Sequence, residues 1–203
     1  MRLRAKAGFA IVMAAVLAPA AAQAVIFDFE ANTPGTTAPF TDTIGGLSAT
    51  FTGEASVCAS SGLFVTLTGN VLIQDLCMLN QSGPLGVSFS SNLSSASFDF
   101  ATAGGPATLT LQAFENASLV ATSTFDSADP PGFFNGEGLA SITATFNRLV
   151  ITSTDLLAID NLNAAPQAQI PEPTSIAVLG AGLFAFGFAW RRRRGMLQSG
   201  RSF

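Results

Sequence analysis

The central part of the chain alternates apolar and polar residues with a period of two. In the segment 96–100, Phe98 and Phe100 share one face. Ser97 and Asp99 share the opposite face. A period of two with one apolar face is typical of β-strands in an antiparallel sheet that buries only one side.

Similar short segments recur at intervals of about ten residues between the two ends of the chain. Turn-forming clusters such as TPG, AGGP and DPPG separate them. The expected strands are 25–30, 47–52, 63–68, 86–90, 96–100, 107–114, 119–125, 141–146, 148–153 and 156–164. The pattern predicts an all-β domain over residues 25–164, an antiparallel β-sandwich of jelly-roll type.

The N-terminal residues have the three parts of a secretory signal peptide. Basic residues precede a short apolar run at 9–17, and Ala22 and Ala24 then occupy the small-residue positions of a cleavage site. A retained N-terminal anchor is the rival interpretation, but the run is short for a bilayer span. Residues 1–24 are therefore expected to be a signal peptide that signal peptidase removes after Ala24.

A second apolar segment near the C-terminus predicts a transmembrane helix. The run 174–190 has no charge, and at about 1.5 Å per residue it would span roughly 25 Å. Four arginines follow it directly: Arg191, Arg192, Arg193 and Arg194. Because positive residues remain on the cytoplasmic side, the domain is expected outside the cytoplasm and residues 195–203 inside.

This C-terminal arrangement resembles the PEP-CTERM sorting signal of Gram-negative bacteria. Pro171, Glu172 and Pro173 precede the apolar run, and the arginine cluster ends it at residue 194. The resemblance implies that an exosortase recognises the Pro-Glu-Pro segment and removes the tag. The expected course is an inner-membrane-anchored precursor, followed by delivery to the cell surface or the extracellular space. Residues 165–170 precede the signal as a linker.

The predicted domain is strongly acidic once both ends are set aside. Twelve of the thirteen acids but only one of the nine basic residues, Arg148, remain in it, which gives a formal charge of −11. Nucleic acid is excluded as a partner, since phosphate binding requires a basic surface. The charge favours solubility outside the cell and suits a divalent cation.

The two cysteines of the chain, Cys58 and Cys77, both lie in the exported domain. Export to an oxidising compartment favours a disulfide between them over two free thiols. A zinc site is not expected, because the chain has no histidine to complete the ligand set.

The first and last expected strands carry FDFE and AIDN. This pairing resembles galactose-binding-like jelly rolls, including many carbohydrate-binding modules. The resemblance implies that Glu30 and Asp160 bind a structural calcium, with backbone oxygens from residues 32–37 completing the shell. The alternative is that both carboxylates are solvated outward positions of edge strands.

Carbohydrate binding would extend this resemblance, although the domain lacks the Trp and Tyr that usually stack on sugars. Phe133 and Phe134 stand in a loop rich in glycine and proline, where exposed aromatics suit ligand contact. The alternative is that one of them fills the end of the sandwich.

Catalysis finds little support in the sequence. Without histidine there is no histidine-based triad, and no serine stands in a nucleophile elbow. The chain is therefore expected to be a non-enzymatic surface or extracellular-matrix protein associated with exopolysaccharide. The main alternative is a calcium-stabilised carbohydrate-binding module. A glycoside hydrolase that uses two carboxylates is a third, less favoured, possibility.

Overall fold

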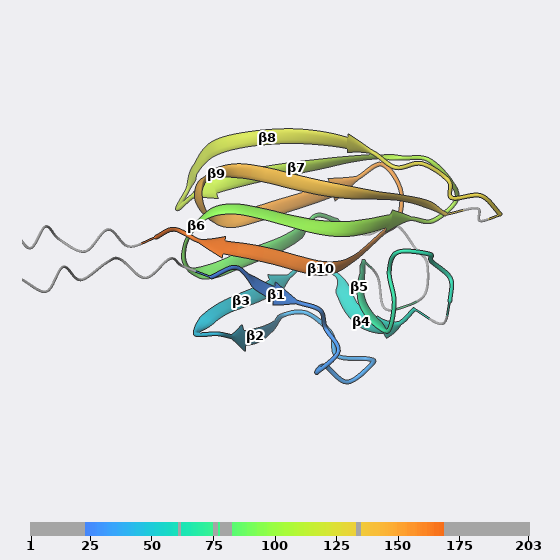
Figure 1. Cartoon of the computed structure of the whole chain (residues 1–203), viewed down its shortest axis with the longest axis horizontal. Coiled ribbons are helices and arrows are strands. Elements are labelled where there is room, and N and C mark those ends of the chain that lie inside the picture. The colour runs from blue at the N-terminus through green and yellow to red at the C-terminus, as the bar shows by residue number, and fades with distance from the viewer. Residues whose placement is uncertain (1–22, 61, 75–76, 78–82, 133–134, 169–203) are drawn as a thin grey trace, which may run out of the picture. The chain divides into compact units, whose positions relative to one another are not determined.

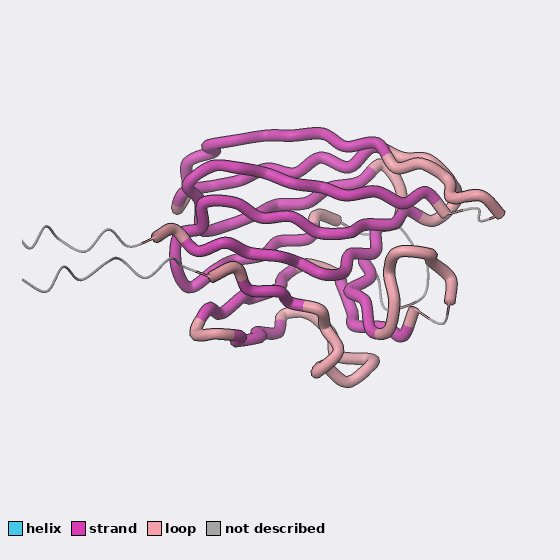
Figure 2. Tube along the Cα trace, in the orientation of Figure 1, coloured by secondary structure: helices cyan, strands magenta, loops and turns pink. Residues whose placement is uncertain are grey.

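The computed structural model describes residues 23–60, 62–74, 77, 83–132 and 135–168. These residues form ten strands, and Figure 2 shows only strands and loops among them. The strands are β1 (Val25–Phe27), β2 (Phe40–Ile44), β3 (Leu47–Thr52), β4 (Ala55–Ala59), β5 (Asn70–Gln74), β6 (Leu85–Thr102), β7 (Thr108–Glu115), β8 (Ser118–Asp126), β9 (Gly136–Ser153) and β10 (Leu157–Pro166).

The two terminal segments with predicted roles lie wholly or mostly outside the described residues. Most of the expected signal peptide, including Ala22, lies outside the described residues, as does everything from residue 169 onward. Within the described part, no helix is long and apolar enough to cross a membrane. The expected transmembrane helix at 174–190 is outside this range.

All strand pairs are antiparallel, in the order β4-β5-β10-β6-β9-β7-β8, with β1 beside β10 and β3 between β2 and β6 (Figure 1). The two longest strands, β6 and β9, have 18 residues each, and each pairs with different partners along its length. The part of β6 from Leu93 onward pairs with β10, whereas Gly86–Phe89 pairs with β3. This all-β, antiparallel architecture confirms the expected sandwich of jelly-roll type.

The core confirms the alternation in the sequence. Phe98 and Phe100 are fully buried, whereas Ser97 and Asp99 are only half-buried on the other side of β6. Burying one phenylalanine side chain contributes about 1.5–3 kcal/mol to stability, so the apolar face of β6 contributes much of the free energy that holds this strand against the core. The other large, fully buried aromatic side chains of the core are Phe27, Phe29, Phe51 and Phe146.

Several expected boundaries differ from the structure. The expected strands 86–90 and 96–100 are one strand, because register shifts around Leu93 bend β6 without ending it. The pair 141–146 and 148–153 likewise belongs to β9. The expected strand at 63–68 is wrong: this segment is a loop, whose backbone donates to a carboxylate instead of a neighbouring strand.

A second apolar cluster lies on the side of the sheet away from the main core. It contains Cys58, Leu67, Val71, Ile73, Ala101, Leu156 and Ala158, with Phe64 and Ala103 packed against it. The loop Gly62–Thr68 supplies Phe64 and Leu67, so it covers part of this cluster. We call this segment the covering loop.

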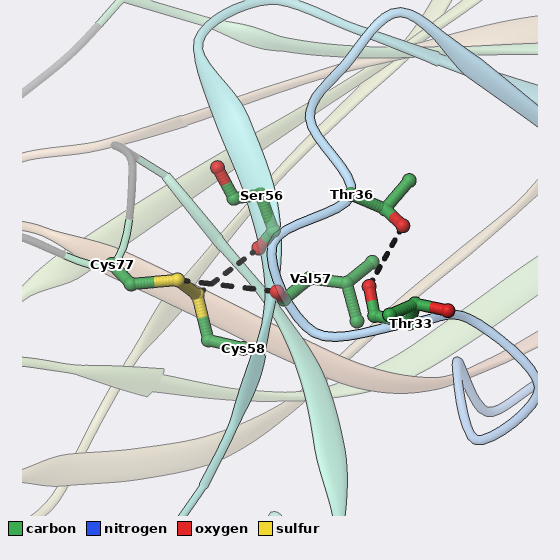
Figure 3. The surroundings of a disulfide bond; sticks show 6 residues. All are labelled: Thr33, Thr36, Ser56, Val57, Cys58 and Cys77. Carbon is green, nitrogen blue, oxygen red and sulfur yellow. Dashed lines mark hydrogen bonds between the residues drawn. A yellow bond between two sulfur atoms is a disulfide. The ribbon is translucent and has the colours of Figure 1, made fainter.

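The expected disulfide is confirmed (Figure 3). It joins Cys58 on β4 to Cys77, with 6.1 Å between their Cα atoms. The Cys77 sulfur lies 3.9 Å from the carbonyl oxygen of Val57. Because a disulfide sulfur carries no proton, this is a close contact and not a hydrogen bond.

Removing the disulfide should destabilise the domain by about 3 kcal/mol, since it closes a loop between positions 19 apart and restricts the unfolded chain. The double variant Cys58→Ala/Cys77→Ala should show this loss in urea denaturation monitored by circular dichroism. Treating the wild type with a reductant should reproduce it, while the double variant should not respond. Equal stability of both forms would contradict a structural role.

Candidate functional site

The site predicted from the two ends of the domain depends on the pairing of β1 with β10. Val25 lies opposite Ala164, and Phe27 lies opposite Leu162. Beyond Phe27 the chain turns at Phe29, whose φ is 60°. Because β1 pairs with β10 in this register, Glu30, three residues after the end of β1, lies close to the part of β10 that carries Asp160.

Asp160 is almost fully buried, with 2 % of its surface exposed. Its Oδ1 accepts a hydrogen bond from the Asn161 N–H at 2.7 Å, and its Oδ2 accepts one from the Thr68 N–H at 3.3 Å. Burial raises the pKa of Asp160 from 3.8 to about 6, against the lowering effect of these two hydrogen bonds. The nearby charges of Glu30 and Asp99 raise it further.

Glu30 is exposed, but its carboxylate is held in place. Its Oε1 accepts the Asn70 N–H at 3.0 Å. A Cβ added at Gly69, whose φ is +70°, would collide with the same oxygen. A side chain at position 69 would be strained at this φ and would displace the Glu30 carboxylate, whereas glycine lets the carboxylate approach the backbone.

The structure thus brings the two predicted carboxylates to one backbone segment, residues 68–70. The expected loop carbonyls are partly engaged already, since Asn32 O accepts from Asn70 Nδ2 at 3.0 Å and Thr36 O accepts from Val57 N at 2.8 Å. Among the described residues, no group of three or more His, Cys, Asp or Glu is arranged to hold a metal. A calcium ion here remains a prediction.

A third carboxylate fixes the covering loop. Glu137, at the start of β9, is buried and accepts the N–H groups of Val65 and Thr66 at 2.6 and 2.8 Å. The Thr66 hydroxyl donates to it as well, at 2.5 Å. Its role was not predicted, because only the fold shows that the loop meets β9.

The aromatic pair proposed for ligand contact, Phe133 and Phe134, lies outside the described residues. The neighbouring Asn135 donates to the Leu63 carbonyl at 3.0 Å. It also lines an apolar cavity of about 140 Å³ beneath the covering loop, together with Leu63, Phe64, Ile73, Ala101, Ala103, Leu156 and Ala158.

A second hollow, of about 310 Å³, opens on β6, β9 and β10 near the start of β1. We call it the hydroxyl groove, because four of its nine lining residues are serine or threonine. It is lined by Ala24, Ser95, Ala96, Ser97, Ser141, Ile142, Thr143, Asn163 and Ala165. Ser97 lies directly opposite both Ser141 and Asn163, so three strands contribute to one row. The alternation in the sequence predicted that Ser97 faces outward, but it did not predict the groove.

Comparison with a family model identifies the C-terminal sorting signal. Residues 169–194 match the PEP-CTERM protein-sorting motif. The PEP-CTERM motif implies a surface protein whose precursor passes through the membrane and is processed by an exosortase. Its Pro-Glu-Pro segment (Pro171, Glu172, Pro173) and arginine cluster (Arg191 to Arg194) lie outside the described residues.

Comparison of the fold gives distant matches, and no curated protein matches by sequence. A tyrosine-to-alanine mutant of the family 29 carbohydrate-binding module CBM29-2 is 12 % identical, with a TM-score of 0.35, over 71 % of this chain and 92 % of the module. An aspartate-to-alanine mutant of that module gives 12 % and 0.34, over 71 % and 91 %. The enzymatically active domain of bacteriophage CBA120 tailspike protein 4 is 8 % identical with a TM-score of 0.34, over 68 % of this chain and 22 % of the tailspike chain.

The raised pKa of Asp160 predicts a specific pH dependence. The native state holds this proton more tightly than the unfolded chain, so the associated stability is present below about pH 4 and is lost as the pH rises through about 6. Asp160→Asn retains an acceptor oxygen for the Asn161 N–H but cannot titrate.

Urea denaturation across this pH range should show the difference in unfolding free energy between wild type and Asp160→Asn changing by up to about 3 kcal/mol. The wild type should lose stability relative to the variant as the pH increases. A difference that is constant with pH would show that the carboxylate is not protonated preferentially in the native state.

Proposed function

We propose that this chain is a non-enzymatic surface protein that an exosortase processes, and that its β-sandwich associates with a neutral exopolysaccharide through the hydroxyl groove. The PEP-CTERM motif supports the surface destination. The groove supports the ligand class, and it is the observation on which the binding proposal depends.

The chemistry of the groove favours a neutral, hydroxyl-bearing ligand. Hydroxyls donate and accept, and the Asn163 amide does both, so the lining matches the mixed hydrogen bonding of sugar hydroxyls. The acidic domain, with its formal charge of −11, would repel an anionic polysaccharide at low salt. The sequence contains no histidine for a histidine-based catalytic mechanism, which favours binding over turnover.

Binding should weaken when the groove loses its hydroxyls. We expect Ser97→Ala/Ser141→Ala to raise the Kd for the purified exopolysaccharide of the producing bacterium by about threefold to tenfold per lost hydrogen bond. Affinity gel electrophoresis measures this directly. Thr41→Ala/Thr43→Ala, two exposed hydroxyls on β2, is the matched control and should bind as the wild type does. Unchanged retention of the groove variant would overturn this binding site.

A calcium-stabilised carbohydrate-binding module is the second candidate, favoured by the approach of Glu30 and Asp160 to residues 68–70. Here a divalent cation would be held by the Glu30 and Asp160 carboxylates, and its charge would offset the cost of burying Asp160. It would stabilise the turn after β1 against β10.

Calcium should then raise the Tm of the wild type measured by differential scanning fluorimetry, and EDTA should reverse the rise. Glu30→Gln should abolish the response, because it removes a charged oxygen ligand while retaining an acceptor for the Asn70 N–H. Glu115→Gln, which changes a carboxylate on β7, is the control and should respond as the wild type does. An equal Tm with calcium and with EDTA in the wild type would exclude the site.

A further inference from the structure

The exposed backbone edges of this sheet are not protected equally. An edge strand presents unpaired N–H and C=O groups that can pair with another chain, and proteins usually cover, shorten or charge such edges. Outer edges belong to β4 and β8 at the two ends of the strand order, to β2 beside β3, and to the three-residue strand β1 beside β10. The part of β9 before Arg148 also pairs with β6 alone, apart from a bridge between Glu137 and Ala128.

The edge of β4 is covered by the chain itself. Val57 donates to the Thr36 carbonyl at 2.8 Å and accepts from the Gly35 N–H at 2.8 Å. Ala55 accepts from the Ala38 N–H, also at 2.8 Å. The segment 35–38 therefore occupies the backbone groups that β4 would otherwise offer.

The edge of β2 is protected by its length and composition. The strand has only five residues, Phe40–Ile44, and Asp42 stands at its centre. Pro39, which has no N–H to donate, precedes it directly. A short strand with a central charge is a poor template for pairing with a second chain.

The edge of β8 has none of these protections. It has nine residues, Ser118–Asp126, and its first charged residue is the last one. It pairs with β7 alone, and among the described residues no backbone hydrogen bond joins its other side to another segment. Leu119 and Val120 are 53 % and 41 % exposed. Figure 1 shows β8 at the top of the sheet with no strand beyond it.

We infer that this edge is a self-association site, where β8 of one copy pairs antiparallel with β8 of a second copy about a two-fold axis. Antiparallel pairing is self-complementary, because each strand offers the same alternation of donors and acceptors to its partner. The two sheets would then form one continuous sheet across the dimer.

Charge favours a second copy at an uncharged edge such as that of β8 over the acidic parts of the surface. The domain carries a formal charge of −11, so most ways of bringing two copies together oppose acidic surfaces. Residues 118–125 are uncharged, and pairing through them places no like charges directly opposite each other near the axis. The exposed apolar side chains Leu119 and Val120 would be partly covered.

Charges at the centre of β8 test this directly in the full chain. Thr122 is exposed at the middle of the strand, so in a two-fold pair it lies opposite or next to its own copy. We expect wild-type protein in detergent to sediment as a dimer of the 20.8 kDa chain, and Thr122→Glu and Thr122→Lys each to lose the dimer. Mixing the two variants should restore it, since opposite charges then meet at the axis.

The same substitutions at Thr43, an exposed threonine on β2, are the matched controls and should leave the dimer intact. A cysteine at position 122 (Thr122→Cys) should also form an oxidative cross-link between two copies, because the native cysteines of the described domain are already paired. Thr43→Cys should not cross-link.

A monomeric wild type overturns the inference, as does a dimer that survives both charges at position 122. Loss of the dimer in both variants without recovery on mixing would also contradict the two-fold pairing, and would favour addition of a strand from another protein. None of these readouts depends on polysaccharide binding.

Discussion

The pairing of β1 with β10 is the constraint on which the other features of this molecule depend. It places Val25 opposite Ala164, so the first and last strands of the domain lie side by side where the chain enters and leaves it. The same pairing brings Glu30 toward Asp160 and sets Ala24 and Ala165 in the lining of the hydroxyl groove. Both predicted cuts, after Ala24 and near Pro171–Pro173, fall outside the core residues 27–164 in the sequence, so neither would remove a residue of the core.

Carboxylates do much of the local positioning in a domain that has almost no basic residues to pair with them. Glu137, Asp160 and Glu30 accept backbone N–H groups from a single stretch of chain between residues 65 and 70. Each hydrogen bond to a charged group contributes about 1.5–3 kcal/mol, which offsets part of the cost of burial. The covering loop consequently lies over the second apolar cluster without any strand pairing of its own.

The sequence allowed the fold class, the disulfide and the sorting motif to be predicted, because each has a local or compositional signal. The alternation of apolar and polar residues predicted Phe98 and Phe100 as core residues. Export to an oxidising compartment predicted the disulfide between the two cysteines. The covering loop could not be predicted, because the sequence LFVTLT has the composition of a strand. It is a loop because two of its N–H groups donate to Glu137, some seventy positions away in the sequence. The hydroxyl groove was also missed, because it combines outward residues from three strands that lie far apart in the sequence.

We propose that the β-sandwich reaches the surface free of both terminal segments. The most direct test is the intact mass of the surface form, from cells that produce the chain with and without an exosortase. When the exosortase is present, we predict the mass of a chain that begins at Val25 and lacks everything after the Pro171–Pro173 region. Without the exosortase, we predict that the C-terminal segment is retained. A surface form that retains Arg191 to Arg194 in the presence of the enzyme would contradict the account, and would make the chain a permanently anchored membrane protein.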